Sequence, residues 1–246
     1  PRNLEQLKAE AQRRADLKLP PVDHVSPQDM RQALSQLHSL EPDDWANAFI
    51  AIGDRYLQEA RQIEPQQPNQ AATLYRRAWE VYNTARWPTE NSPRKKVAYQ
   101  KALEAFVAYG ALVSPPIEVV RFPFEGRQAV AYLRLPAQVR PAPLLFAISG
   151  LDTRKEDMVV TNDLFLKNGI GIFAIDQPGT GQSPIKIDVG AERVFSAALD
   201  FLAQRRDVDA IPSHHRLCGR ASLGIFLGPL GAGRQQGDRD AVQGVG

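Results

Sequence analysis

The first 113 residues carry hydrophobic side chains every three to four positions, a spacing that predicts amphipathic α-helices. Ser92-Pro93 supplies an N-cap residue followed by proline at the first helical position, which is typical of a helix start. We therefore expect about four or five helices that pack through their hydrophobic faces. The clearest hydrophobic stripe is formed by Trp45, Phe49, Ile52, Tyr56, Ala60 and Ile63.

The pattern changes at Ser114-Pro115-Pro116, where helical spacing gives way to short stretches rich in β-branched and aromatic residues. Residues 117–122 and 128–135 flank Glu125-Gly126, an arrangement that predicts a β-hairpin. The change in spacing predicts a domain boundary between residues 113 and 114.

Two later stretches, residues 144–148 and 170–175, are almost continuously hydrophobic, and glycine or aspartate follows each within two residues. Such stretches are typical of strands that are buried on both faces of a parallel sheet. Helical spacing at residues 157–167 and 192–204 alternates with them. The order strand, helix, strand, helix predicts a parallel sheet with right-handed crossovers.

The expected fold class is therefore α/β, with an α-helical cap region at residues 1–113 and an α/β domain at residues 114–246. We expect a mostly parallel, doubly wound sheet that is incomplete at the C-terminus. With 246 residues and 43% hydrophobic content, the chain has ample material for a packed core. Its 30 basic and 28 acidic residues leave a formal net charge of +2, which does not favour nucleic acid or an anionic membrane surface as a partner.

A single cysteine, Cys218, excludes an intramolecular disulfide and a cysteine-based zinc cage, which indicates a reducing compartment or a protein indifferent to the redox state of its compartment. The sequence has no run of about 18 hydrophobic residues that would indicate a membrane span. The polar stretch from Arg2 to Arg14 does not resemble a secretory signal. We expect a cytoplasmic protein with no membrane or nucleic-acid partner, no cofactor and no metal.

Ligands of open α/β sheets bind at the carboxyl ends of the strands, so the loops after the predicted strands are candidate sites. Three loops are informative: residues 149–157, 176–183 and 217–224. The first is suited to present backbone N–H groups to a developing oxyanion. The second has two glycines but no phosphate-binding motif, so it does not support nucleotide binding. Asp176 is interpreted as the residue that holds this loop by side-chain hydrogen bonds, with a catalytic carboxylate as the alternative.

The third loop approximates a nucleophile elbow, the sharp turn between strand and helix that exposes a serine above the sheet. Ser222-Leu223-Gly224 supplies the second half of the pattern G-x-S-x-G. Arg220 stands where the first glycine of that pattern belongs. By itself this segment is weak support for a catalytic serine, because Ser-x-Gly is common.

Taken together, the three loops in this order resemble those of the α/β-hydrolase superfamily. The likeness is greatest to the branch that contains dihydroxypseudooxynicotine hydrolase and the fermentation-respiration-switch esterase-like proteins, whose members also carry a helical N-terminal segment. It covers roughly residues 40–224 and is most specific in the loops at residues 149–157 and 176–183. The resemblance implies a hydrolase that acts on a small molecule, at an ester or at a carbon–carbon bond next to a ketone.

The resemblance also implies roles for individual residues in catalysis. Ser222 would be the nucleophile, and the backbone N–H groups of Leu223 and of Leu151 or Asp152 would line the oxyanion hole. The family mechanism further requires an acid and a histidine that follow the serine in the chain.

This sequence departs from the family pattern around and after the elbow. All four histidines, His24, His38, His214 and His215, precede Ser222. The segment from Gly224 to Gly246 lacks the hydrophobic helix face that should follow the elbow. We therefore expect a truncated hydrolase with little activity by itself, whose sequence from about residue 212 is degraded or frameshifted. The alternative is a non-catalytic interaction or regulatory protein on a relic hydrolase scaffold, and a homodimer is allowed for.

Overall fold

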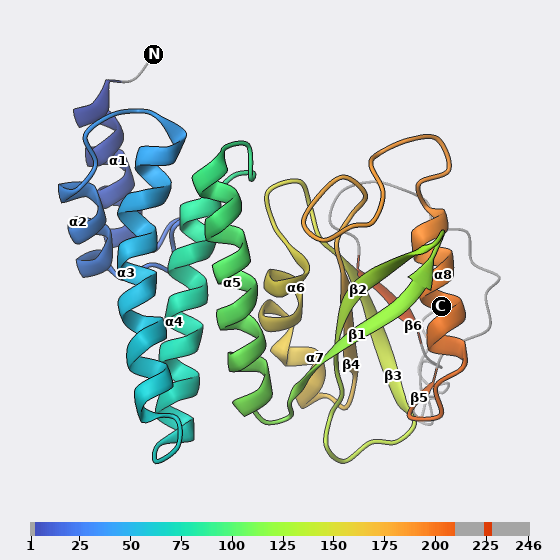
Figure 1. Ribbon diagram of the computed structural model, residues 1–246. Helices are drawn as coiled ribbons and strands as arrows, with labels where there is room; N and C mark the ends of the chain where they lie inside the picture. The colour runs from blue at the N-terminus through green and yellow to red at the C-terminus, as the bar shows by residue number, and fades with distance from the viewer. Residues whose placement is uncertain (1–2, 210–223, 228–246) are drawn as a thin grey trace, which may run out of the picture.

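The computed structural model describes residues 3–209 and 224–227, in which a helical region is followed by a mixed β-sheet with helices on both faces (Figure 1). The helices are α1 (Leu4–Asp16), α2 (Pro27–Ser35), α3 (Pro42–Ile63), α4 (Pro68–Arg86), α5 (Pro93–Leu112), α6 (Lys155–Thr161), α7 (Asp163–Lys167) and α8 (Arg193–Ala203). The strands are β1 (Ile117–Phe124), β2 (Arg127–Arg134), β3 (Ala142–Ile148), β4 (Gly171–Ile175), β5 (Val208–Asp209) and β6 (Gly224–Leu227).

Five helices form the region before the sheet, in agreement with the four or five expected. Proline occupies the first turn of α2, α3, α4 and α5, where its missing N–H costs no hydrogen bond. The side chain of Ser92 caps α5. Along α3, Phe49 and Ile52 are buried, while Trp45 packs against the same core from a partly buried position. Secondary structure changes from helix to strand between α5 and β1; the division into two domains stays a prediction.

The sheet has the strand order β1-β2-β4-β3-β5, and β6 pairs with β3. The predicted hairpin is confirmed, since β1 and β2 are antiparallel and turn at Glu125-Gly126. Strands β3 and β4 run parallel, with Leu144 opposite Gly171 and Ile148 opposite Ile175. The pairing of β3 with β5 is also parallel, whereas β2 with β4 and β3 with β6 pair antiparallel. The sheet of the described residues is therefore mixed and not mostly parallel as expected. The expected α/β class is confirmed.

The single helix predicted at residues 157–167 is wrong in detail, because the structure has two short helices, α6 and α7. The break lies at Asn162, whose backbone leaves helical geometry at φ −101° and ψ 22°. Its side chain donates a hydrogen bond back to the carbonyl oxygen of Met158 at 2.6 Å. Such local side-chain bonds compete with the helical hydrogen-bond ladder.

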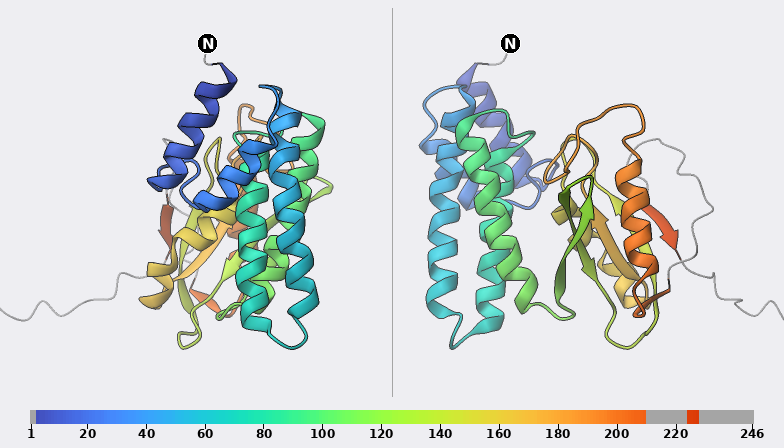
Figure 2. Two further views of the ribbon diagram at one scale, coloured as in Figure 1. Left: turned by 90° about the vertical axis from the view of Figure 1, so that its left-hand side faces the viewer. Right: turned by 45° about the vertical axis from the view of Figure 1, so that its right-hand side comes forward.

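Helices cover the two faces of the sheet unequally (Figure 2). On one face, α8 packs its buried residues Val194 and Leu202 into a core formed with β1 to β4. On the other face, a single hydrophobic core runs from the N-terminal helices through Val159 of α6 to Tyr132 and Ile172 of the sheet. The helical region and the sheet therefore share one core.

No helix in the described part of the chain combines the length and apolar character needed to cross a membrane.

Candidate active site

Two of the three candidate loops lie next to each other at the carboxyl ends of β3 and β4, at the upper end of the sheet in Figure 1. The parallel register of β3 and β4 brings their ends together. The N–H of Ser149 donates to the carbonyl oxygen of Ile175 at 3.0 Å, and the N–H of Gln177 donates to the hydroxyl of Ser149 at 3.2 Å. The two loops are thus fixed to each other where they leave the sheet.

Asp176 holds both loops through its buried carboxylate, which is 1% exposed. One oxygen accepts from the N–H of Lys155 at 2.9 Å and from the hydroxyl of Ser149 at 3.3 Å. The other accepts from the Lys155 ammonium and from the N–H of Gln182, each at 2.9 Å. The prediction that Asp176 holds its loop is confirmed, and both of its oxygens are occupied in doing so.

Lys155, Glu156 and Asp176 form a buried ionic cluster below the loops. The Lys155 ammonium donates to Glu156 at 2.8 Å and lies 5.1 Å from the ring centre of Tyr132. Burial works to raise the pKa of Asp176, but Lys155 and the backbone N–H of Gln182 together hold that pKa below the ordinary value. Burial raises the pKa of Glu156, and Lys155 only partly offsets this effect. The two carboxyl groups share one cation but differ in acidity, because Asp176 also accepts from the backbone N–H groups of Lys155 and Gln182.

The loop after β3 presents two backbone N–H groups that no other described residue binds. The N–H of Gly150 donates to the hydroxyl of Thr153 at 2.7 Å, which closes the loop. Within residues 3–209 and 224–227, neither the N–H of Leu151 nor that of Asp152 donates to a protein acceptor. The Leu151 residue is 63% exposed, so solvent and small molecules reach this part of the loop.

The carbonyl groups of the same loop face two buried arginines. The guanidinium of Arg154 donates from Nη1 to the carbonyl oxygens of Leu151 at 3.1 Å and Thr153 at 2.7 Å. Arg86, at the end of α4, donates from Nη1 to the carbonyl oxygen of Asp152 at 2.9 Å. Both arginines are 1% exposed. A residue of the helical region thus binds the backbone of the candidate oxyanion loop directly.

Two carboxylates neutralise these arginines. Glu90, between α4 and α5, accepts from Nη2 of Arg154 with both oxygens, at 3.0 and 2.8 Å. Asp157 accepts from the backbone N–H of Arg154 at 2.8 Å and lies 3.7 Å from Nη2 of Arg86. Burial alone would lower the pKa of Arg154, but Glu90, with smaller contributions from Tyr99 and Asp176, raises that pKa above the ordinary value. We call Arg86, Glu90, Arg154 and Asp157 the guanidinium cluster.

Ser222 and Leu223, the predicted nucleophile and second oxyanion residue, lie outside the described residues, as do His214 and His215. Of the histidines that the structure describes, His24 approaches the hydroxyl of Thr84 at 3.1 Å, within the helical region. The structure therefore places the predicted donors Leu151 and Asp152 and leaves the prediction for Ser222 untested. Among the described residues, no group of three or more His, Cys, Asp or Glu side chains is arranged to hold a metal ion.

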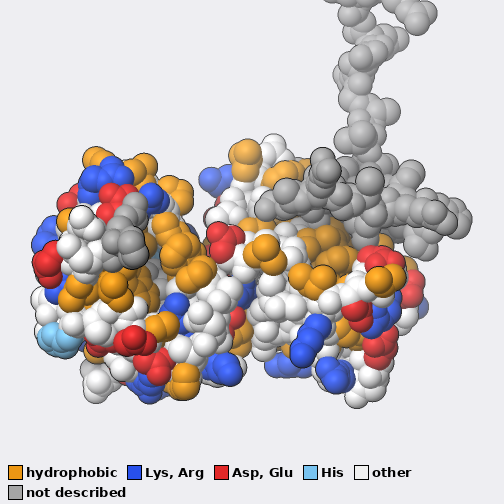
Figure 3. Space-filling model, turned by 90° about the horizontal axis from the view of Figure 1, so that it is seen from above, with side chains coloured by type: hydrophobic (Ala, Val, Ile, Leu, Met, Phe, Trp, Pro, Cys, Tyr) orange, Lys and Arg blue, Asp and Glu red, His pale blue; other side chains and the backbone are white. Residues whose placement is uncertain are grey.

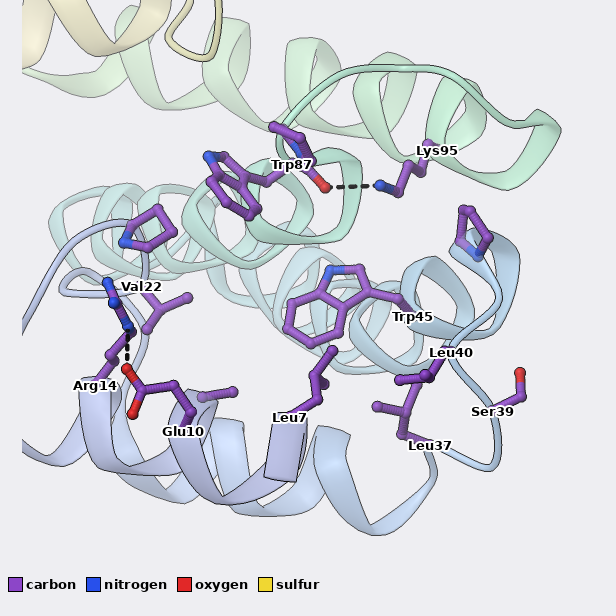
Figure 4. Close-up of a pocket in the computed structure, with 14 residues that line it drawn as sticks. Leu7, Glu10, Arg14, Val22, Leu37, Ser39, Leu40, Trp45, Trp87 and Lys95 are labelled. Carbon is purple, nitrogen blue, oxygen red and sulfur yellow. Dashed lines mark hydrogen bonds and ion pairs between the residues drawn. The ribbon is translucent and has the colours of Figure 1, made fainter. Parts of the chain in front are cut away.

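An open pocket of about 420 Å³ lies in the helical region (Figure 4). Trp45 and Trp87 face it from α3 and from the connection after α4, and the paired side chains of Glu10 and Arg14 stand on the α1 side. All the residues that line it belong to the helical region, so the two loops contribute nothing to it. Seen from above the loops, hydrophobic side chains are exposed on both the helical part and the sheet-containing part (Figure 3).

Sequence reasoning missed the guanidinium cluster. A local signal was present, because four consecutive charged residues, 154–157, follow a strand that is buried on both faces. Charged side chains that follow a buried strand are themselves often buried, and buried charges need partners of opposite charge. Nothing local identified Arg86 or Glu90 as the partners, since they lie more than 60 positions earlier in the chain.

Comparison with known protein families identifies a model described as esterase FrsA-like, which matches residues 42–215. Among curated proteins, 2,6-dihydropseudooxynicotine hydrolase of Paenarthrobacter nicotinovorans is 26% identical over 186 residues, which cover 74% of this chain and 50% of that protein. Esterase FrsA of Photobacterium profundum is 24% identical over 157 residues, which cover 62% of this chain and 37% of that protein. The chain spans half or less of the length of these relatives.

Solved structures show the same fold. The crystal structure of 2,6-dihydroxy-pseudo-oxynicotine hydrolase superposes with a TM-score of 0.66 at 24% identity, covering 76% of this chain and 53% of the other. AbyA5 superposes with a TM-score of 0.57 at 22% identity, covering 74% of this chain and 49% of the other. At these identities the likeness establishes the fold alone, which is the expected α/β-hydrolase fold with preceding helices.

Proposed function

This chain belongs to the FrsA-like esterase family, and we propose on that premise that it carries part of the active site of a serine hydrolase. In this proposal Ser222 attacks a carbonyl carbon, and backbone N–H groups of Leu223 and of the loop after β3 stabilise the tetrahedral oxyanion. The substrate is a small molecule with an ester, or with a carbon–carbon bond next to a ketone.

One observation carries the proposal: in the loop after β3, the N–H groups of Leu151 and Asp152 donate to no acceptor among the described residues, and buried side chains hold the backbone of this loop in place. An oxyanion hole works because its donors are oriented before the reaction, so that no free energy is spent on reorienting them. The loop also follows a parallel strand at its carboxyl end, where α/β folds place their ligands. This arrangement supports acyl-group chemistry.

A serine needs a general base to become nucleophilic. In the chain order of this fold the histidine follows the serine, whereas all four histidines of these 246 residues precede Ser222. We therefore expect slow turnover by these residues alone and acceleration by a base that is added to the solution.

The test is reaction of the purified chain with a fluorophosphonate probe, in the absence and presence of free imidazole, with the labelled peptide identified by mass spectrometry. We expect slow labelling at Ser222 that imidazole accelerates severalfold, because imidazole takes over proton removal. Ser222→Ala should abolish the signal. Ser183→Ala is the matched control and should retain it, since the Ser183 hydroxyl bonds the carbonyl oxygen of Ile185 within its own loop.

A folded chain that fails to label with and without imidazole would contradict the proposal. That result would favour the second candidate, a non-catalytic interaction protein on a hydrolase scaffold. Circular dichroism on the same sample establishes that the chain is folded, so that a negative result counts against Ser222.

A further inference from the structure

The three consecutive carbonyl groups of residues 151–153 all accept hydrogen bonds from buried guanidinium groups. Leu151 and Thr153 bond Arg154, and the residue between them, Asp152, bonds Arg86. An exposed loop has no intrinsic need for this, because water satisfies carbonyl groups at the surface. Both arginines are almost completely buried, and each also lies against a carboxylate, Glu90 for Arg154 and Asp157 for Arg86. Arg86 donates in addition to the side chain of Asn83 at 2.7 Å and to the carbonyl oxygen of Pro88 at 3.2 Å.

Fixing a carbonyl group also fixes the N–H group of the next residue. A peptide unit is planar and trans, so the C=O of one residue and the N–H of the following residue point in opposite directions. The bond from Arg154 to the Leu151 oxygen therefore turns the N–H of Asp152 away from the guanidinium. The bond from Arg86 to the Asp152 oxygen fixes the next peptide plane in the same way.

The N–H of Leu151 is oriented less firmly than that of Asp152. It belongs to the peptide whose carbonyl is that of Gly150, and within the described residues that carbonyl accepts no hydrogen bond from either arginine. Of the two candidate donors, Asp152 alone thus has its peptide plane set by a buried charged group.

Glu90 connects this orientation to the helical region. Both its oxygens bind Nη2 of Arg154, which leaves Nη1 to face the loop. The rigid planar fork of arginine transmits this constraint, because its donors cannot rotate independently. Lysine, with one rotating ammonium group, cannot bind the carboxylate and two carbonyl groups in the same geometry.

We propose that the N–H of Asp152 is the oxyanion donor of this loop, and that Arg154, Arg86 and Glu90 are the positioning residues that orient it. The inference rests on the proposed hydrolase function for its catalytic meaning. Its structural part is that the guanidinium cluster keeps the backbone of residues 151–153 rigid. This part stands independently of whether Ser222 reacts.

The experiment compares the full chain with Arg154→Lys, Arg86→Lys and Glu90→Gln, and uses Arg76→Lys as the control. Arg76 lies on the surface of α4, where it pairs with Glu80 at 3.0 Å. Backbone ¹⁵N relaxation gives the order parameters of the amides of residues 151–153. We expect values near about 0.85 in the parent and control and below about 0.6 in the three variants, with unchanged values in α4 and β3.

The second measurement is the rate of fluorophosphonate labelling at Ser222 in imidazole. Loss of one oriented donor should reduce this rate by about 10²-fold in Arg154→Lys, while Arg76→Lys reacts like the parent. A loop that stays rigid in both Arg154→Lys and Glu90→Gln would overturn the inference, and so would a mobile loop with an unchanged labelling rate. Failure of the parent chain to label would count against the proposed function, and the order parameters would still decide whether the cluster holds the loop.

Discussion

The Asp176 carboxylate lies directly against the Cα of Gly181, and no side chain fits between them. A Cβ atom built on Gly181 overlaps the oxygens and the carboxyl carbon of Asp176. Gly181 also has a φ of +50°, in the left-handed region that side chains disfavour. The loop after β4 therefore folds tightly round a buried carboxylate because glycine occupies this position.

Replacing Gly181 by alanine should destabilise the protein by about 3 kcal/mol or more. Backbone strain accounts for about 1–2 kcal/mol, and each disturbed hydrogen bond to the buried carboxylate adds about 1.5–3 kcal/mol. Chemical denaturation measures the free energy of unfolding. Gly126→Ala is the matched control, since Gly126 has a φ of +73° but open space round its Cβ position. If the two substitutions lower the free energy of unfolding equally, the close contact of Gly181 with Asp176 contributes nothing to stability.

At a second glycine, Gly53, substitution by alanine should change stability in the direction opposite to that usual for a helix. Alanine normally stabilises a helix by about 1 kcal/mol over glycine, yet Gly53→Ala in α3 should destabilise this protein. A Cβ atom there lies closer than 3.0 Å to three atoms of the buried Tyr82 ring in α4, so overpacking of about 1–3 kcal/mol outweighs propensity. In a Tyr82→Leu background the same substitution should become stabilising. A stabilising effect in the parent would contradict the close helix contact.

Lys155→Met should cost about 3–5 kcal/mol of unfolding free energy, because it leaves the buried carboxyl groups of Glu156 and Asp176 without their cation. Lys101→Met is the control: Lys101 is also 2.8 Å from a carboxylate, that of Asp54, but both side chains are partly exposed. Lys101→Met should lower the free energy of unfolding by no more than about 1 kcal/mol. Similar decreases in the free energy of unfolding in both variants would mean that burial does not strengthen the ion pairs of Lys155 with Glu156 and Asp176.

Glu156 makes stability depend on pH. Burial raises its pKa in the folded state above the ordinary value of 4.5, so the folded protein binds more protons than the unfolded chain in the interval between the two pKa values. The contribution of Glu156 to stability is therefore greatest below its unfolded pKa and falls as pH rises through that interval. Glu156→Gln should therefore gain stability relative to the parent as pH rises above the ordinary value of 4.5.

Denaturation curves at several pH values measure this difference. Glu59→Gln, at an exposed position of α3, controls for the general effect of removing one negative charge. A difference that is constant with pH would exclude a raised pKa of Glu156, whereas a difference that declines with pH would indicate a lowered one.

The sequence predicted those parts of the fold that depend on neighbouring residues. The hairpin at Glu125-Gly126 and the parallel pair β3 and β4 follow from local hydrophobic spacing and turn residues. The function of Asp176 in its loop was predictable for the same reason, since it bonds the N–H of Gln182, six residues later. The split between α6 and α7 was missed, because one side-chain bond from Asn162 decides it.

The guanidinium cluster was beyond sequence reasoning because its members come from distant parts of the chain. Arg86 and Asp152 are 66 positions apart, and Glu90 and Arg154 are 64 positions apart. Their meeting depends on how the helical region packs on the sheet, which hydrophobic spacing does not specify. The same spacing also leaves open which of two adjacent N–H groups, that of Leu151 or that of Asp152, is oriented by the fold.

The core that runs from the helices into the sheet has a consequence for how the protein folds. Phe106 of α5 packs against Tyr132 of β2 with ring centres 4.9 Å apart, and Ile172 and Ala174 belong to the same core. These sheet residues would face water without the helices, and the free energy of burying them is gained only when both parts are present. The protein should therefore melt in one cooperative transition, with no intermediate in which the sheet persists after the helices have unfolded.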